Sequence, residues 1–410
     1  MKVSDTAEIQ SAPARLHLTK CVVCGSTASK SLWSVDRTPI HPFRPRTAAG
    51  STAGFGTLDI VRCAGCGHIY NAAFDPSGAE DLYGAFVLTN VPVSPSMVKA
   101  VEGTAEFILR HSGSKPAILE IGGGGGALSI LLSEQAREVH LVEPSRALSA
   151  DRFAGTRVQF HQSMFPAASL GNRKFDVVVC RQVLEHVPDP APFLRALRTQ
   201  TNDGGLAYIE LPSAEYIHAA TSVVDFHYPH VHYYSRPHLR AMFGRAGFAV
   251  VETVDVKDGH DTAFLLRAVE NAEMQPPKLD GGDDLGRLLA ERRARGRERL
   301  DAIAGAIGLY GANAYSQALF GIYPGSSFAA MFDDTPMYEG QLAYGPSFDV
   351  PIERPSASRL AGLGAVVITA YLHDRTIAEK VRSFGFEGPV YSVRSDAQSG
   401  RGELPPSLFR

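Results

Sequence analysis

The stretch PAILEIGGGGGALSILLSEQAREVHLVEPS, from Pro116 to Ser145, decides the fold of the chain. Its apolar run at 117–121 is typical of a strand that is buried on both faces of a parallel sheet. Five glycines follow, then a helical pattern of apolar residues, then a second apolar strand that ends at Glu143. A strand, a glycine loop, a helix and a second strand predict a doubly wound α/β domain.

The glycine loop is compatible with two kinds of cofactor. Glu120, Gly122, Gly124 and Gly126 spell E-x-G-x-G-x-G, and the same letters also fit the dinucleotide fingerprint G-x-G-x-x-A. Glycines let the backbone touch a ligand, and an acid about 20 residues later, here Glu143, can bind both ribose hydroxyls. The carboxylate of Glu120 would repel a pyrophosphate but suits the ammonium and sulfonium of S-adenosylmethionine. The sequence therefore favours S-adenosylmethionine, with an NAD enzyme as the alternative.

The α/β pattern continues after this stretch. An apolar strand at 175–180 leads into a helix that begins with VLEHVPDP (183–190), and another strand lies in DGGLAYIELPS (203–213). This series resembles the class I S-adenosylmethionine-dependent methyltransferases over roughly residues 95–270. The resemblance implies that the glycine loop wraps the methionine part of the cofactor and that Glu143 holds its ribose. It also implies contacts from Ser163 and Met164 to the adenine and from Gln182 near the methionine end.

Four of the five cysteines form two matched C-x-x-C-G pairs, CVVCG at 21–25 and CAGCG at 63–67. Such short turns aim both thiolates at one ion, and four thiolates complete a tetrahedral zinc site with no open position for catalysis. The predicted structural zinc ligands are Cys21, Cys24, Cys63 and Cys66. The 38 residues between the pairs predict a hairpin with a long loop at about 41–56. Cys180 lies in an apolar strand and is expected in the core.

A third region repeats the alternation of strands and helices. A polar helix at 285–305 precedes LYGANAYSQ and FDDTP, which read as a strand, a glycine turn and a helix, and then a strand that ends in acids. The fold class is therefore α/β: a methyltransferase-like Rossmann sheet, a small N-terminal zinc-binding module and a second C-terminal Rossmann-like domain. The expected boundaries are 1–80, 81–274 and 275–410.

This order of domains resembles the sugar C-methyltransferases, which act on nucleotide-linked keto-deoxysugars. Its landmarks here are the two cysteine turns, LEIGGGGG, HYPHVHYYS, LYGANAYSQ and FDDTP. The resemblance implies that the C-terminal domain helps to bind the nucleotide of the substrate; the alternative is that it only closes the active site. The implied substrate contacts are Tyr310, Gly311, Asn313, Asp333 and Asp334.

The segment HYPHVHYYS, from His227 to Ser235, is the candidate catalytic region. The resemblance assigns His230 as the base that removes the proton beside the sugar ketone, a task that suits a neutral imidazole. Pro229 stands where the family has a glutamate. Further catalytic candidates are Tyr233 as an oxyanion donor, His186 on the helix after the fourth strand, and Tyr83.

Other interpretations of the histidines and of the chain stay open. His227, His230 and His232 follow H-x-x-H-x-H, which would fit a metal site, and they would equally fit a loop with satisfied hydrogen bonds. The leading function is methyl transfer to a small-molecule biosynthetic intermediate, with a nucleotide-linked ketosugar as the first choice of acceptor. The alternatives are an O- or N-methyltransferase of a specialised metabolite and a non-catalytic nucleotide-binding scaffold.

Composition limits the partners and the compartment. A chain of 410 residues exceeds one ordinary core, so several domains are expected. A net charge of −3 argues against nucleic-acid and acidic-membrane partners, which usually need a basic face. The N-terminus has no signal-peptide pattern and no apolar run is long enough to span a membrane, so a cytoplasmic monomer or homodimer is expected.

Overall fold

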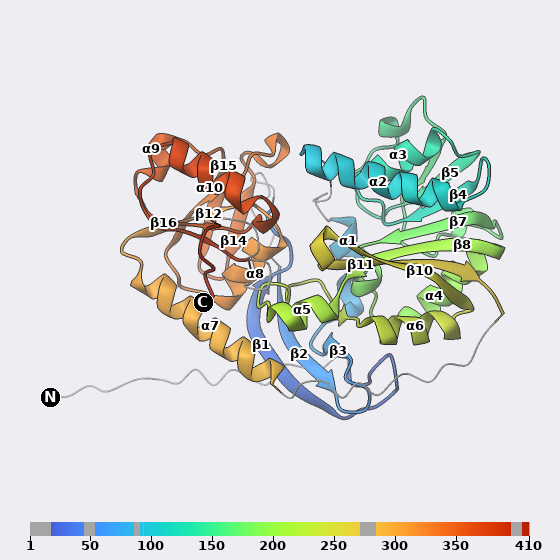
Figure 1. Cartoon of the computed structure of the whole chain (residues 1–410), viewed down its shortest axis with the longest axis horizontal. Helices are drawn as coiled ribbons and strands as arrows, with labels where there is room; N and C mark the ends of the chain where they lie inside the picture. The colour runs from blue at the N-terminus through green and yellow to red at the C-terminus, as the bar shows by residue number, and fades with distance from the viewer. Residues whose placement is uncertain are drawn as a thin grey trace.

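The computed structural model describes residues 18–44, 54–85, 91–92, 94–270, 284–394 and 404–409. These residues form three sheets. In Figure 1 the N-terminal sheet (blue) lies below the central domain (cyan to yellow) and the C-terminal domain (orange to red). The predicted α/β class, with an N-terminal module and a second C-terminal α/β unit, is confirmed. No helix in the described part of the chain is both long and apolar enough to cross a membrane.

The N-terminal sheet is a small antiparallel sheet that borrows a strand from far along the chain. Its order is β1-β2-β3-β9. The strands are β1 (Ser29–Pro39), β2 (Phe55–Cys63), β3 (Ile69–Asn71) and β9 (His232–Tyr233). The predicted hairpin between the cysteine pairs is the β1–β2 pair; residues 45–53 of its predicted loop lie outside the described residues. Through β9, the segment HYPHVHYYS completes the edge of this sheet.

The central sheet has seven strands in the order β6-β5-β4-β7-β8-β11-β10. They are β4 (Ala117–Ile121), β5 (Glu138–Val142), β6 (Val158–His161), β7 (Phe175–Arg181), β8 (Thr201–Pro212), β10 (Phe248–Val256) and β11 (Asp261–Ala268). β11 runs antiparallel to both neighbours, and all five residues of β4 are buried. The strand order reverses beside β4, and ligands bind doubly wound sheets at the carboxyl ends of the strands at such a point.

Helices cover the central sheet and connect its strands. They are α1 (Ala79–Gly84), α2 (Pro95–His111), α3 (Ala127–Ser133), α4 (Pro190–Gln200), α5 (Ala214–Ala220) and α6 (Arg236–Arg245). α2 begins at an N-cap serine, Ser94, whose hydroxyl accepts the amide of Met97, and Pro95 occupies its first turn.

The C-terminal sheet has six strands in the order β14-β15-β13-β12-β16-β17. They are β12 (Ala306–Tyr310), β13 (Phe328–Phe332), β14 (Leu342–Gly345), β15 (Phe348–Glu353), β16 (Leu363–Ile368) and β17 (Val390–Ser392), with helices α7 (Leu285–Ala302), α8 (Ala314–Ile322), α9 (Ala357–Leu360) and α10 (Asp374–Ser383). All pairs are parallel except β14–β15.

The domain boundaries expected after residues 80 and 274 stay predictions.

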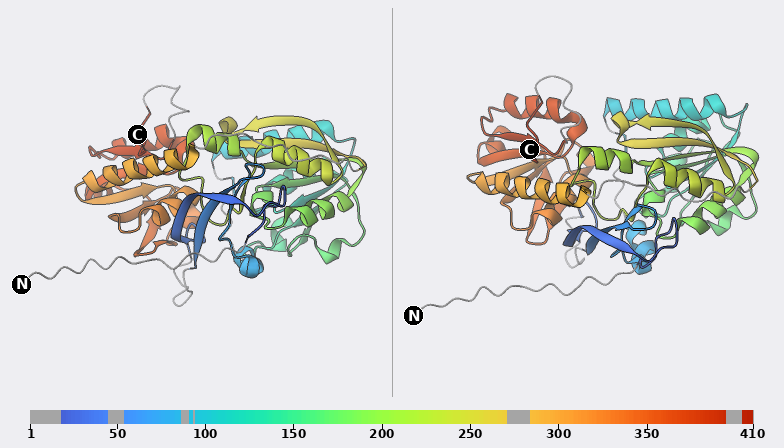
Figure 2. Two further views of the ribbon diagram at one scale, coloured as in Figure 1. Left: turned by 90° about the horizontal axis from the view of Figure 1, so that it is seen from below. Right: turned by 60° about the horizontal axis from the view of Figure 1, so that its bottom comes forward.

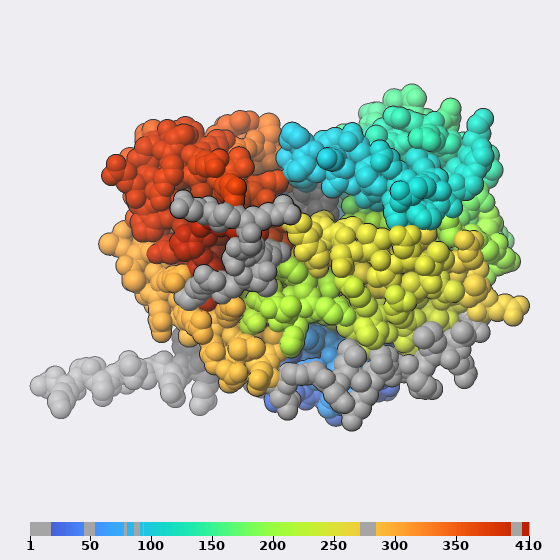
Figure 3. Space-filling view, in the orientation of Figure 1, coloured from blue at the N-terminus to red at the C-terminus, as the bar shows by residue number. Residues whose placement is uncertain are grey.

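The three parts share buried contacts. The side-chain amide of Gln317, on α8, is 1% exposed and donates to the carbonyls of Pro39 (2.5 Å) and Tyr228 (2.7 Å). One apolar core includes Trp33, Phe226 and Phe320, which come from all three parts. Figure 2 shows the blue N-terminal sheet packed against both neighbours, and in Figure 3 α5 (light green) lies where the two larger halves meet. The segment HYPHVHYYS therefore contacts the N-terminal sheet through β9 and the C-terminal domain through the Tyr228 carbonyl.

Candidate active site and cysteine centre

The glycine loop after β4 has a backbone that only glycine adopts readily. Gly122, Gly124 and Gly126 have φ values of +69°, +53° and +71°. A Cβ on Gly122 would lie 2.3 Å from Val183, and one on Gly126 would lie 2.5 Å from the ring of Phe153. A Cβ on Gly124 would meet nothing within 4 Å. The loop is thus packed against the protein at both ends and faces open space in the middle, as a loop that touches a ligand must.

Two buried carboxylates support this loop. Glu143 follows β5 and accepts hydrogen bonds from the amides of Gly124 and Ser145, both at 2.9 Å. Glu120, on β4, accepts a hydrogen bond from the hydroxyl of Ser129. Burial raises the pKa of both carboxyl groups. The Glu143 carboxylate joins the loop to the end of β5 and keeps free lone pairs for the hydroxyls of a ribose.

The remaining cofactor candidates lie at the same edge of the sheet. Ser163 and Met164 follow β6, and Met164 is 37% exposed. Gln182 follows β7 in the left-handed region, with φ +53°, and its amide donates to Asp261 at 2.8 Å. The structure therefore brings all eight predicted cofactor residues to the carboxyl ends of β4 to β7. A glycine cradle flanked by carboxylates, with room at Gly124, fits S-adenosylmethionine.

Three of the four catalytic candidates also come together. The rings of His186 and His230 have centroids 4.8 Å apart, and the ring of His227 lies 4.1 Å from that of His230. Tyr83, on α1, lies 5.8 Å from the His186 ring and donates a 3.4 Å hydrogen bond to the His186 carbonyl. The backbone of α1 reaches the cofactor side, because the Gly84 carbonyl accepts the amide of Arg146, just after Glu143.

Burial keeps these imidazoles neutral near pH 7. It lowers the pKa of His186 and of His227 to about 4, and it holds the pKa of His230 well below its usual range. Burial likewise raises the pKa of the Tyr83 and Tyr233 hydroxyls, so that both keep their protons. The histidines are therefore uncharged and each keeps one ring-nitrogen lone pair, although their lowered pKa makes them weaker bases than a free imidazole, and the tyrosines are hydrogen-bond donors.

Three expectations about individual histidines and Tyr233 need correction or refinement. His186 lies not on the helix after β7 but on the single 3-10 turn η4 (Leu184–His186), because α4 begins only at Pro190. The H-x-x-H-x-H set does not converge: His232, in β9, lies 3.1 Å from His68 and 3.2 Å from the Pro188 carbonyl, which makes it a structural residue. Tyr233 is 3% exposed and packs on Phe226, with its ring 6.2 Å from that of His230.

Sequence reasoning missed Glu185, which lies beside these histidines. One carboxylate oxygen of Glu185 and one ring nitrogen each of His186 and His230 lie within 4.8 Å of one another. Glu185 is 1% exposed, and burial raises its pKa to about 8. The sequence did contain a signal for this residue: Glu185 lies between apolar residues in VLEHV, and a glutamate in such a buried run usually has a specific partner.

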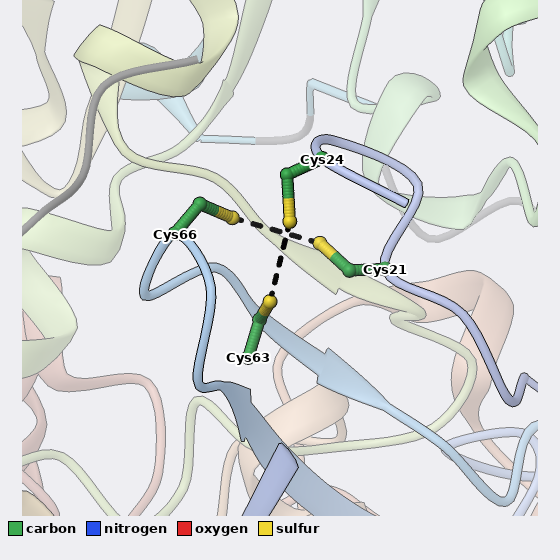
Figure 4. A group of neighbouring side chains, drawn as sticks. All are labelled: Cys21, Cys24, Cys63 and Cys66. Atoms are coloured by element: carbon green, nitrogen blue, oxygen red, sulfur yellow. Dashed lines mark hydrogen bonds between the residues drawn. The ribbon is translucent and has the colours of Figure 1, made fainter. Parts of the chain in front are cut away.

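The four cysteines of the two C-x-x-C-G turns converge on one point in space, as Figure 4 shows. The sulfurs of Cys21 and Cys66 are 3.6 Å apart, those of Cys24 and Cys63 are 3.5 Å apart, and all four lie within 4.8 Å of one another. A tetrahedral site with Zn–S bonds of about 2.3 Å has sulfurs about 3.8 Å apart. The donor set and its spacing fit zinc. Cys180 is buried in β7, as expected.

The glycines of the two cysteine turns adopt matching conformations. Gly25 and Gly67 have φ values of +77° and +79°. The amide of Gly25 donates to the Cys21 carbonyl (2.8 Å), and that of Gly67 donates to the Cys63 carbonyl (2.9 Å). The repeated C-x-x-C-G pattern therefore encodes the same turn twice.

The predicted substrate contacts of the C-terminal domain lie together after β12 and β13. The Tyr310 hydroxyl donates to Asp334 (2.8 Å), which also pairs with Lys380 (2.5 Å). Asp333 accepts the amide of Ala312 at 2.8 Å. Gly311 has φ +114°, and the side chain of Asn313 caps α8 by accepting the amides of Tyr315 and Ser316.

A charged histidine joins the central and C-terminal domains. Nε2 of His260 lies 2.9 Å from Asp225 and 2.9 Å from the hydroxyl of Tyr315, and Nδ1 lies 2.5 Å from Asp261. Burial opposes the charge, but the two aspartates raise the pKa of His260 to about 10. Asp261 also pairs with Lys257. This network continues to Gln182 at the cofactor edge through Asp261.

Comparisons with known proteins identify the central domain. Residues 99–253 match a family described as "Methyltransferase domain". Ubiquinone biosynthesis O-methyltransferase from Stutzerimonas stutzeri (strain A1501) is 35% identical over 97 residues, which are 22% of this chain and 42% of the relative. The same enzyme from Aeromonas salmonicida (strain A449) is 37% identical over 98 residues, 22% of this chain and 41% of the relative. The chain thus spans less than half the length of these curated relatives.

Two solved structures each match 42% of the chain. An S-adenosylmethionine-dependent methyltransferase from Clostridium acetobutylicum ATCC 824 has 14% identity and a TM-score of 0.36, over 42% of this chain and 91% of that one. The Burkholderia thailandensis 1,6-didemethyltoxoflavin-N1-methyltransferase has 21% identity and a TM-score of 0.34, over 42% and 79%. From the family match, the central part of this chain is an S-adenosylmethionine-dependent methyltransferase domain.

Proposed function

We propose that the protein transfers a methyl group from S-adenosylmethionine to a small-molecule biosynthetic intermediate. The observation that carries the proposal is the family match over residues 99–253, joined to the open glycine loop with its carboxylate at Glu143. In this proposal Gly122, Gly124 and Gly126 hold the methionine part, and Glu143 binds the ribose. Ser163 and Met164 flank the adenine, while Glu120 and Gln182 lie on the methionine side.

The most specific form of the proposal is carbon methylation of a nucleotide-linked ketosugar, with His230 as the general base. A C–H beside a ketone can be deprotonated when the enolate is stabilised, and a neutral imidazole can accept that proton. The enolate carbon then bonds to the methyl group as the C–S bond breaks, leaving the cofactor as its neutral thioether. In this proposal His230 receives the proton, and Tyr83, whose ring packs against that of His186, turns its hydroxyl from the His186 carbonyl to the developing oxyanion.

His186 and Tyr233 take supporting positions in this proposal. His186 packs against both Tyr83 and His230, so it sets the shape of the pocket. Tyr233 lies in β9, directly beyond the loop that carries His230. The C-terminal domain would hold the nucleotide of the substrate through Tyr310, Gly311, Asn313, Asp333 and Asp334, and Gln317 joins that domain to the carbonyl just before Pro229.

The cysteine centre would hold one structural zinc ion. Because β3 of this module pairs with β9, the zinc would stabilise the strand that follows His230. Elemental analysis of the full chain should give about one zinc per chain. A Cys21→Ser/Cys63→Ser double variant should lose it, whereas Cys180→Ser should keep it. A metal content near zero in the parent protein would refute this assignment.

Oxygen methylation is the second candidate. The two curated relatives reported above are named as O-methyltransferases, which favours a hydroxyl as the acceptor. A hydroxyl acceptor would also lose a proton to His230, so the pocket serves either reaction. The two candidates differ in one measurable property, because only carbon methylation passes through an enolate.

Two measurements test the proposed function. Calorimetry should show binding of S-adenosylhomocysteine in the micromolar range, and absence of binding would refute the cofactor assignment. With activated ketosugars in D₂O, the carbon beside the ketone should exchange its proton in the presence of S-adenosylhomocysteine. Exchange that persists unchanged in His230→Ala would show that another group is the base, and methyl transfer to a hydroxyl without any exchange would support the second candidate.

A further inference from the structure

The histidine pocket contains three side chains with the ligand atoms of a metal site. Glu185 and His186 are neighbours on η4, and His230 comes from the loop before β9, 44 residues after His186. One ligand atom from each lies within 4.8 Å of the other two. The four cysteines form the only other such group among the described residues. The fold thus assembles two candidate ligand sets, one of sulfur and one of nitrogen and oxygen.

Glu185 is the unusual member of this set. Its side chain is 1% exposed, and within the described chain neither carboxylate oxygen has a hydrogen bond from another residue. Buried carboxylates normally have hydrogen bonds, a cation or a proton. The nearby cations have other partners, since Lys257 pairs with Asp261 and Arg181 pairs with Glu210. The basic group that contacts Glu185 is the imidazole of His186, whose Nε2 lies 3.9 Å from Oε1.

The geometry of His186 directs one of its nitrogens to the centre of the set. Its Nδ1 lies 3.4 Å from the Pro229 carbonyl, which leaves Nε2 on the side of Glu185. A histidine whose second nitrogen is oriented by a backbone carbonyl is the usual arrangement of a metal ligand. His230 packs its ring against that of His186, so the two imidazoles line one side of the set and Glu185 the other.

We propose that Glu185, His186 and His230 form a binding site for a divalent transition-metal ion, separate from the cysteine centre. Two imidazoles and one carboxylate favour Zn²⁺, Co²⁺, Ni²⁺ or Fe²⁺ over Mg²⁺ and Ca²⁺, which prefer oxygen ligands. Ligand bonds of about 2.0–2.2 Å place the ligand atoms roughly 3–3.5 Å apart. Glu185 Oε1 lies 3.9 Å from His186 Nε2, and no pair in the set exceeds 4.8 Å, so small side-chain rotations bring the ligand atoms to these separations.

The site has a consequence for catalysis that rests on the proposed function. The lone pair with which His230 would bind the metal ion is the same lone pair that would accept the proton of the substrate. One nitrogen cannot do both, so an occupied site has no free base at His230. The metal ion therefore inhibits methyl transfer, and its removal restores the activity.

The test uses the full chain with its cysteine centre already loaded with zinc. Titration with Co²⁺ should show one further equivalent, with the visible absorption of a nitrogen and oxygen site and without the thiolate charge-transfer bands that cysteine ligands give. Glu185→Gln and His186→Gln should each weaken this equivalent by at least about 10-fold. His218→Ala removes an exposed histidine on α5 and should leave it unchanged.

The outcomes separate this inference from the proposed function. Absence of the second equivalent, or unchanged Co²⁺ affinity in both variants, overturns the site whether or not the protein methylates anything. Binding of S-adenosylhomocysteine to the same samples reports on the fold of the variants and on the cofactor assignment independently. Methyl transfer should fall with the same midpoint as Co²⁺ binding. Activity that is unchanged at saturating Co²⁺ overturns the inhibitory role.

Discussion

The molecule contains two strand–loop–helix units of the same design, and their loops differ. In the central domain β4 and β5 are followed by the glycine loop and Glu143; in the C-terminal domain β12 and β13 are followed by the Gly311 turn and Asp333. Each acid accepts two backbone amides. Glu143 takes those of Gly124 and Ser145 at 2.9 Å, and Asp333 takes those of Ala312 and Thr335 at 2.8 Å.

The difference lies in what faces each loop. Gly124 faces open space, whereas a Cβ on Gly311 would lie 2.8 Å from the Ala370 amide nitrogen and 2.8 Å from the Thr369 hydroxyl. Asn313 uses its side chain to cap α8. The backbone at Gly124 therefore faces space that a ligand could enter, whereas Gly311 packs against Ala370 and Thr369, so a ligand of the second unit would meet its side chains and not this glycine. Two units with the same strand order and an acid at the same position therefore need not bind ligands in the same way. The free space next to the loop glycine determines whether a ligand can contact the loop backbone.

The largest expected contrast is catalytic. His230→Ala, beside the first unit, should lower kcat by roughly 10²–10⁴-fold because it removes the proposed general base. Its affinity for S-adenosylhomocysteine should stay as in the parent protein. Asp334→Asn, in the second unit, should raise KM for a nucleotide-linked acceptor and leave kcat unchanged. Steady-state kinetics with both variants measure this; a comparable loss of kcat in Asp334→Asn would break the comparison.

The two acids should differ strongly in cofactor binding. In the proposed site, Glu143→Ala removes a charge-assisted hydrogen bond to the ribose, worth about 1.5–3 kcal/mol. We expect the Kd for S-adenosylhomocysteine to rise by roughly 10–100-fold, as measured by calorimetry. Asp333→Ala is the matched change in the second unit and should leave this Kd as it is. An equal rise in Kd in Glu143→Ala and Asp333→Ala would show that the cofactor does not bind at the glycine loop after β4.

Alanine should cost more stability at Gly311 and more cofactor affinity at Gly124. Gly311→Ala forces a side chain against the Ala370 backbone at φ +114° and should lower the free energy of unfolding by at least about 2 kcal/mol. Gly124→Ala meets no atom and should cost about 1 kcal/mol for its backbone alone. Gly124→Ala should nevertheless weaken cofactor binding more. Urea unfolding and calorimetry on both variants test whether the free space next to each glycine determines its effect on stability and on cofactor binding.

The smallest expected effect concerns the charged junction between the two units. His260 has a pKa of about 10 in the folded chain against about 6.5 when unfolded. Its contribution to the free energy of unfolding is therefore complete below about pH 6.5 and is lost as the pH rises towards 10. Asp261 has a lowered pKa, because Lys257 and His260 outweigh its burial, so its contribution is lost as the pH falls through the acid range.

Urea unfolding between pH 6 and pH 9.5 measures this junction. The parent protein should lose stability over that range, and His260→Gln should lose less, because the residue that titrates is gone. Tyr315→Phe keeps the charge of His260 and serves as the matched control, with the pH slope of the parent. Equal slopes in parent and His260→Gln would show that His260 is not charged in the folded chain.

Local patterns predicted the fold well because they have local causes. The buried run at 117–121 became β4 with those bounds, and each C-x-x-C-G turn formed because it needs only its own glycine; the pairing of β1 with β2 then brings the two turns together. The acid after the second strand was also predictable, because carboxyl ends of parallel strands share an edge.

The candidate site was less predictable because its contacts are distant in sequence. Glu185 and His230 are 45 residues apart, and only the packing of η4 against the loop before β9 brings them together. His232 pairs with His68 across 164 residues, so its spacing from His230 carried no information about its partner. The spacing of residues in sequence predicts neighbours within one helix or strand, whereas this pocket brings together residues from several segments.

The pairing of β3 with β9 has a practical consequence for anyone who wishes to work with the catalytic part alone. A fragment that begins at residue 81 would contain His232 and Tyr233 but not Ile69 and Tyr70, the strand partners they pair with. In the fragment this strand edge would be exposed, with unpaired backbone groups and with aromatic side chains that are buried in the full chain. Such an edge promotes association between copies. Expression of the central domain should therefore include the N-terminal module from Leu18 onward, and the C-terminal domain should be kept as well, because Gln317 donates hydrogen bonds to Pro39 and Tyr228.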